Sequence, residues 1–171
     1  DERRKYKGRF CYRTPTARDE EGALALFQEM SSRPTTIVSM NVAIAYGCIR
    51  GHKSTMADAI KAYIQSYLDT PVPTYIEIPK KLCSQKFRHM KRPCFRLVKA
   101  LYGHPEAGAH WERHLTKIVK ALGGVPVSGH PSCFWFSGTK LFLIIYVDDL
   151  LLSGPSEEHE KFWKVLGEQV N

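Results

Sequence analysis

Two adjacent aspartates, Asp148 and Asp149, interrupt the most apolar part of the sequence. The strand-like run 141–147 precedes them, and a second largely apolar run, 150–154, follows. Because both runs are rich in aliphatic residues, the pattern predicts a β-hairpin with two carboxylates at its tip. Asp is a poor strand former and is rarely buried without a partner. The tip is therefore either a plain turn or a cation-binding site, and a tight two-residue turn normally prefers Gly.

The other segments alternate between helical and strand-like patterns. The 171 residues, 43% of them hydrophobic, suffice for one compact core with at most a small appended subdomain. The sequence therefore predicts one domain of the α+β class. Helices are expected at 20–30, 36–46, 106–122 and 157–170, and further strands at 9–13, 75–78 and 133–136.

Basic residues are concentrated in two segments of the chain, whose formal net charge is +8. The first segment, 3–13, interleaves cations with aromatic residues. Cations hold phosphates while aromatic rings stack on bases, so both segments favour nucleic acid as a partner. The alternative is an ordinary solvated basic surface. The second segment, 80–99, contains no acid and eight basic residues: Lys80, Lys81, Lys86, Arg88, Lys91, Arg92, Arg96 and Lys99.

The five cysteines form no C-x-x-C pair, and their number is odd. This usage favours the reduced thiols of an intracellular protein over a disulfide framework. No apolar segment approaches the roughly 18 residues that a membrane span needs, so no membrane partner is expected. The chain begins with Asp1 rather than Met, as expected of a piece of a longer polyprotein.

Four motifs, in order, resemble those of a known family. Tyr146-Val147-Asp148-Asp149 is similar to the tyrosine-x-aspartate-aspartate hairpin of reverse transcriptases. Residues 58–64 resemble the first palm motif of the copia (Ty1-like) class, an Asp followed five positions later by an aromatic residue. Residues 96–103, with Trp111 eight positions after the glycine, resemble its second motif, and 7–10 resemble its short basic fingers strand. The chain thus resembles the fingers and palm of a copia-class reverse transcriptase.

The resemblance implies a catalytic centre built from Asp58, Asp148 and Asp149. Asp58 and Asp148 are ninety positions apart (148 − 58), so only folding can bring them together. Such carboxylates would bind two Mg²⁺ ions, which Mn²⁺ can replace. On the family pattern, Asp58 and Asp148 bind metal most directly and Asp149 supports them.

Four further residues match family positions that contact the incoming nucleotide. Lys7 and Arg9 correspond to cations on the triphosphate, although in isolation they would be ordinary surface charges. Tyr63 corresponds to a ring that blocks a nucleotide 2′-hydroxyl, which implies deoxynucleotide preference; in isolation it would be a core aromatic. Glu106 stands where copia-type enzymes commonly carry a nucleotide-positioning glutamine. An anion there opposes triphosphate binding, yet Glu is also favourable at a helix start.

The implied fold is a reverse-transcriptase palm, an antiparallel sheet backed by helices, with a fingers subdomain. The fingers would comprise about 1–55 and 72–95, and the palm about 56–71 and 96–171. The resemblance ends before the thumb, connection and RNase H parts that family members normally carry.

The implied activity is RNA-directed DNA synthesis during retrotransposition, on a template–primer and with deoxynucleoside triphosphates. Integrase and RNase H would be further parts of the polyprotein, and the implied location is a cytoplasmic virus-like particle or the nucleus. The residues expected to contact nucleic acid are Tyr146, Lys86, Arg88, Lys91 and Arg92.

Other interpretations stay open. A decayed element could bind nucleic acid without polymerising, and a two-metal nuclease would explain the acids alone. A zinc hydrolase is disfavoured because His110 and His114 lack a Glu directly after the first His. Cys83, His89 and Cys94 lack the paired spacing of a structural zinc site.

Overall fold

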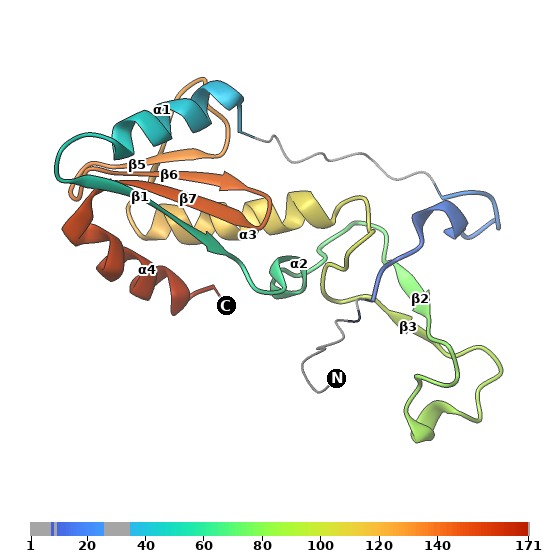
Figure 1. Ribbon diagram of the computed structural model, residues 1–171. Helices are drawn as coiled ribbons and strands as arrows, with labels where there is room; N and C mark the ends of the chain where they lie inside the picture. Colours follow the sequence, from blue (N-terminus) through green and yellow to red (C-terminus); the bar gives the residue numbers. More distant parts are fainter. Residues whose placement is uncertain (1–7, 9, 26–34, 171) are drawn as a thin grey trace, which may run out of the picture.

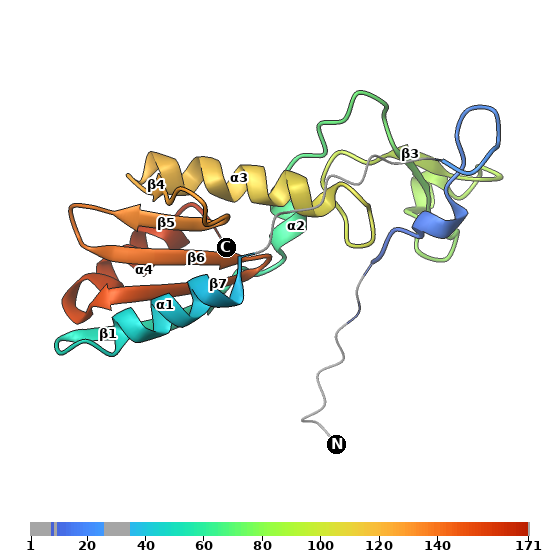
Figure 2. The ribbon, with the colours of Figure 1, turned by 90° about the horizontal axis from the view of Figure 1, so that it is seen from above.

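The computed structural model describes residues 8, 10–25 and 35–170. They form a larger lobe, in which helices cover a β-sheet, and a smaller lobe built around a two-stranded hairpin (Figures 1 and 2). The fold is α+β with antiparallel strand pairing. None of the described helices is long and apolar enough to cross a membrane.

The larger lobe is organised around one five-stranded antiparallel sheet, with strand order β1-β7-β6-β5-β4. Its centre is the predicted apolar hairpin, in which β6 and β7 pair from Phe142–Ser153 to Tyr146–Asp149. The edge strand β1 then pairs with β7 along its whole length. The strands are β1 (His52–Asp58), β4 (Val125–Pro126), β5 (Cys133–Phe136), β6 (Leu141–Tyr146) and β7 (Asp149–Pro155).

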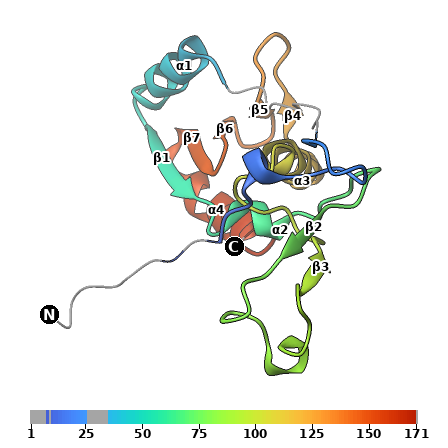
Figure 3. The same ribbon diagram turned by 90° about the vertical axis from the view of Figure 1, so that its right-hand side faces the viewer.

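Helices cover both faces of this sheet, as Figure 3 shows. Helices α3 (Ala107–Ala121) and α4 (His159–Gly167) pack on one face, and α1 (Ile37–Gly47) packs on the other. Side chains alternate along each strand, so Leu143 and Leu152 enter the α3–α4 core while Ile144 and Leu151 face α1. Burying each such aliphatic side chain contributes about 1.5–3 kcal/mol, so the central hairpin adds stability on both faces of the sheet.

A buried polar network fixes α4 to the edge strand. The Thr55 hydroxyl of β1 lies 2.7 Å from Nδ1 of His159 and accepts a 2.8 Å hydrogen bond from Nε1 of Trp163. Nε2 of His159 lies 3.2 Å from the Gly154 carbonyl, which can only accept, so Nε2 carries the proton. Nδ1 therefore accepts from Thr55, and each of these polar groups has a partner.

The smaller lobe begins after the short helix α2 (Ala62–Gln65). Strands β2 (Tyr75–Glu77) and β3 (Cys94–Arg96) form its hairpin, and the connection between them carries the basic residues and the turn η2 (Gln85–Phe87).

Two further 3-10 turns lie outside this hairpin. The turn η3 (Ser156–Glu158) leads into α4, and η1 (Thr14–Thr16) belongs to the N-terminal segment. That segment docks on the loop before α3, because the Tyr12 amide donates to the Tyr102 carbonyl at 2.7 Å.

Several expected elements differ from those observed. The run 52–58 is a strand that its mostly polar composition did not predict, and cross-strand pairing with the apolar β7 overrides its weak local preference. The predicted fingers–palm boundary near residue 55 therefore falls inside β1. Described residues 10–13 form no strand. The last helix is shorter than predicted, since 156–158 form a 3-10 turn.

The helix predicted at 20–30 is wrong where the structure describes it, over 20–25. The Asp19 carboxylate accepts a 2.8 Å hydrogen bond from the Ala23 amide, and Arg18 forms a bridge with Leu24. Gly22 has a φ of 83°, which a helix does not allow. Local side-chain hydrogen bonding has thus made a turn here. Residues 26–30 lie outside the described part.

Candidate active site

Asp58 and Asp149 face each other across two neighbouring strands. Asp58 ends β1, Asp149 begins β7, and the two are direct register partners. The Ala59 amide donates to the Asp148 carbonyl at 2.8 Å, so 58 and 149 form a non-hydrogen-bonded pair. Such pairs hold their Cα atoms about 4.5 Å apart with both side chains on one face. The fold therefore brings together the aspartates that the sequence separates.

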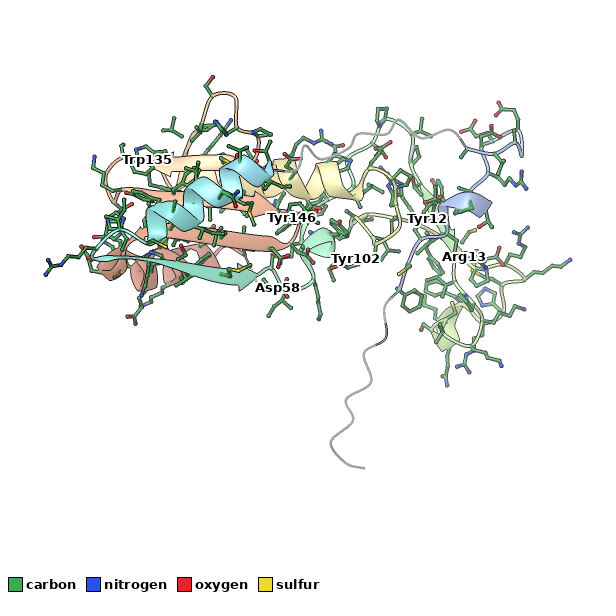
Figure 4. All side chains as sticks on the ribbon, turned by 45° about the horizontal axis from the view of Figure 1, so that its top comes forward. Tyr12, Arg13, Asp58, Tyr102, Trp135 and Tyr146 are labelled. Carbon is green, nitrogen blue, oxygen red and sulfur yellow. The ribbon has the colours of Figure 1, made fainter. Side chains whose placement is uncertain are left out.

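The sheet face next to this pair is open. Met56, two residues before Asp58, is 67% exposed, and Tyr146, the register partner of Asp149 in β6, is 49% exposed. Asp58 and Asp149 are themselves exposed. Figure 4 shows Asp58, Tyr146 and Tyr102 at the end of the sheet that faces the smaller lobe, far from Trp135. A ligand can thus reach the carboxylates from the side that α1 leaves uncovered.

The turn between β6 and β7 is strained. Its first central residue, Val147, has a φ of 58°, a conformation that primed hairpin turns require and that β-branched residues rarely adopt. The cost is roughly 1–2 kcal/mol. Nε1 of Trp111, a residue of α3 that is 1% exposed, donates a 2.6 Å hydrogen bond to the Val147 carbonyl and helps to hold the turn. Strain of this kind is typical of functional sites.

Asp58 and Asp149 place two carboxylates at directly opposite positions of neighbouring strands. Like charges directly opposite each other weaken strand pairing. Among the described residues, ion pairs within 4 Å join only Arg92 to Glu77 and His110 to Glu106, so no described cation forms an ion pair with the aspartates. The described side chains contain no group of three or more His, Cys, Asp or Glu that could hold a metal ion. Backbone register pairs Asp58 with Asp149, and Asp148 precedes Asp149 in the turn between β6 and β7.

Tyr63 lies beside this group. Its ring packs against Tyr102 with centroids 4.6 Å apart. Burial raises the pKa of the Tyr63 phenol, and the negative charge of Asp148 raises it further. Tyr63 and Asp148, two of the predicted site residues, are therefore close enough to interact, and Asp149 pairs with Asp58 on the neighbouring strand.

Glu106 is the residue just before α3, which begins at Ala107, one residue later than predicted. Its carboxylate lies 3.7 Å from Nε2 of His110, one turn along the helix. Burial lowers the pKa of His110, as does Arg113, while Glu106 acts in the opposite direction. The Glu106 side chain is only 16% exposed, so it is occupied within its own helix.

The basic residues predicted to contact nucleic acid lie on the β2–β3 connection, in the smaller lobe and away from the aspartates. Lys86, Arg88 and Lys91 are exposed. Arg92 instead donates from Nε and Nη2 to one oxygen of Glu77, at 2.9 and 2.7 Å. This hydrogen bonding raises the pKa of Arg92 and ties together the two sides of the hairpin. Lys7 and Arg9 lie outside the described residues.

Comparison with known proteins links the chain to transposons. It is 25% identical, over 101 residues, to a Saccharomyces cerevisiae protein that its name assigns to transposon Ty5-1. The match covers 58% of this chain and 31% of that protein, so the chain spans about a third of its relative's length. No family model and no solved structure matches. The similarity supports a retrotransposon-related origin.

Proposed function

We propose that the chain is the fingers-and-palm part of a copia-class reverse transcriptase, which extends a primer 3′-hydroxyl with deoxynucleotides. The observation that carries the proposal is the direct pairing of Asp58 with Asp149, next to Asp148 in a strained turn. The strand register pairs two of the three carboxylates that the sequence motifs select, and the third, Asp148, directly precedes Asp149 along the chain. The match to a transposon protein agrees with this assignment.

The donor set suits Mg²⁺ or Mn²⁺, because hard divalent cations prefer carboxylate oxygens and would relieve the repulsion among these acids. Asp58 and Asp149, which are exposed register partners, would supply two of the carboxylates, and Asp148 would supply the third from the turn. When bound, such ions neutralise the reacting phosphates and lower the pKa of the attacking hydroxyl. Trp111 contributes by holding the turn through Val147.

The neighbouring residues would position the substrates. The ring of Tyr63, braced by Tyr102, forms a wall beside Asp148 and, by family resemblance, would exclude a ribonucleotide 2′-hydroxyl. The exposed cations Lys86, Arg88 and Lys91 are suited to hold template or primer phosphates. Lys86 also lies 5.6 Å from the ring centroid of Phe87, so charge and aromatic surface occur together.

A non-catalytic nucleic-acid-binding remnant is the second candidate. Glu106 favours this candidate, because its carboxylate replaces the glutamine common in the family and opposes a triphosphate. Its contact with His110 also holds it against α3. This candidate predicts salt-sensitive binding of primer–template without nucleotide incorporation.

The test is primer extension on poly(rA)/oligo(dT) with Mg²⁺ or Mn²⁺, combined with thermal unfolding in Mn²⁺ and in EDTA. We expect metal-dependent incorporation by the wild type and its loss in Asp148→Asn. Mn²⁺ should raise the unfolding temperature of the wild type but not of Asp58→Asn, since ligands that bind only the folded state stabilise it.

Asp69→Asn is the matched control, because it makes the same chemical change at an exposed loop position outside the carboxylate group. It should retain both incorporation and the Mn²⁺ response. Equal incorporation by Asp148→Asn and Asp69→Asn would falsify the catalytic assignment. Binding of primer–template without incorporation by the wild type would select the non-catalytic candidate.

A further inference from the structure

The outer side of α3 carries a row of positive charge that the proposed active site does not use. Arg113, Lys117 and Lys120 follow one another at spacings of four and three residues, so they lie along one side of the helix. All three are exposed. The opposite side of α3 is the core face, formed by Trp111, Leu115 and Val119. We call these three cations, with the adjoining Lys99, His114 and Tyr67, the α3 ridge.

Lys99 and Tyr67 extend the α3 ridge from a neighbouring segment. The two form an isolated β-bridge, and Nζ of Lys99 lies 3.6 Å from the ring centroid of Tyr67. Lys99 also donates to the Gln65 carbonyl at 2.9 Å, which fixes its position. Tyr67 remains 66% exposed, so much of its ring surface is open.

Two cations of the α3 ridge, Lys99 and Lys117, are close enough to His114 to act on it. Burial lowers the pKa of His114, and the positive charges of Lys99 and Lys117 lower it further. Within the described ranges, no carboxylate lies within 4 Å of Lys99, Lys117 or Lys120. Neighbouring unneutralised cations repel one another and are favourable mainly when an anion binds.

We propose that the α3 ridge is a second binding site for nucleic acid, which takes the phosphate backbone of a single strand. It lies on the far side of the sheet from Asp58 and Asp149, because those residues share the α1 face while α3 covers the other (Figure 3). The strand bound here is therefore distinct from one at the carboxylates.

The aromatic residue favours a single strand over an acidic polypeptide. Lysines alone would suit either polyanion, but an exposed ring beside a fixed cation offers a stacking surface for an unpaired base. Lys117 lies four residues, or about 6 Å along the axis, beyond Arg113, and Lys120 lies about 4.5 Å further. Successive cations can thus contact successive phosphates of one extended strand.

The test measures binding of fluorescein-labelled oligothymidylate by anisotropy at several salt concentrations, in EDTA. A background variant, Lys86→Gln/Arg88→Gln/Lys91→Gln, removes three of the hairpin cations so that the contribution of the α3 ridge is easier to resolve. Adding Lys117→Gln/Lys120→Gln should weaken binding at least tenfold. It should also reduce the slope of log K against log salt by about 1.4, for two lost contacts to single-stranded phosphate.

The matched control is Lys161→Gln/Lys164→Gln on α4, which removes the same charge from two exposed lysines at the same spacing. It should leave binding and slope nearly unchanged. Equal weakening by the two pairs, or complete loss of binding in the background variant alone, would overturn the proposal. So would equally tight, Lys117-dependent binding of polyglutamate, which would reassign the surface to an acidic polypeptide. Because EDTA removes divalent ions, failure of the proposed polymerase activity does not affect this result.

Discussion

Replacing Thr55 by Val tests whether the buried network holds α4 against the strand that carries Asp58. Valine has nearly the same shape as threonine but neither donates nor accepts a hydrogen bond. The change removes the 2.7 Å contact with His159 and the 2.8 Å hydrogen bond from Trp163. Nδ1 of His159, in a residue that is 1% exposed, then has no partner.

The expected loss follows from these two contacts. A buried polar group left without a partner costs about 1–3 kcal/mol, and the hydrogen bond from the half-buried Trp163 adds about 0.5–1.5 kcal/mol. The free energy of unfolding should therefore fall by about 1.5–4.5 kcal/mol. For a chain of this size, such a loss lowers the unfolding temperature by roughly 3–18 °C.

Urea unfolding followed by tryptophan fluorescence measures the change, with an unchanged slope showing that the same surface is exposed. Thr55→Ser is the matched control because it keeps the hydroxyl and removes only a methyl group. It should lose less than about 1 kcal/mol. A Thr55→Val midpoint equal to that of the wild type, or an equal loss in both variants, would refute the hydrogen-bond argument.

Three more predictions concern the same fold. Burial lowers the pKa of His104, His110, His114 and His159 below about 6.5, so the unfolded chain binds more protons in mild acid. Urea midpoints should be constant above about pH 7 and fall as the pH drops through 6.5; a midpoint that rises there would contradict this. Trp111→Phe should lower the free energy of unfolding by about 1–3 kcal/mol, measured in urea, and reduce primer extension, because the Val147 carbonyl loses its donor. Gly103→Ala should release the N-terminal segment to proteolysis, since Gly103 has a φ of 86° and an added Cβ would collide with the Tyr12 carbonyl; unchanged protease resistance would count against that contact.

The sequence was most informative where the signal is local. The apolar runs around Asp148 and Asp149 predicted the central hairpin, and helical periodicity predicted α3 to within one residue at each end. Both elements are dominated by strong patterns of neighbouring residues, so short-range preference and burial agree. Where they disagree, as in the polar strand β1, prediction failed because pairing with a distant segment decided the structure.

The order of motifs identified three candidate carboxylates, but not that two of them, Asp58 and Asp149, are direct register partners. Contacts between distant segments decided three features that the sequence did not show. Asp58 pairs with Asp149, and Trp111 holds the strained turn at Val147. Lys99 lies beside the cations of α3. Strand register and helix packing minimise the free energy of the whole core rather than of one segment. The sequence by itself therefore determined which groups are available for chemistry, and the tertiary structure decided which of them stand together.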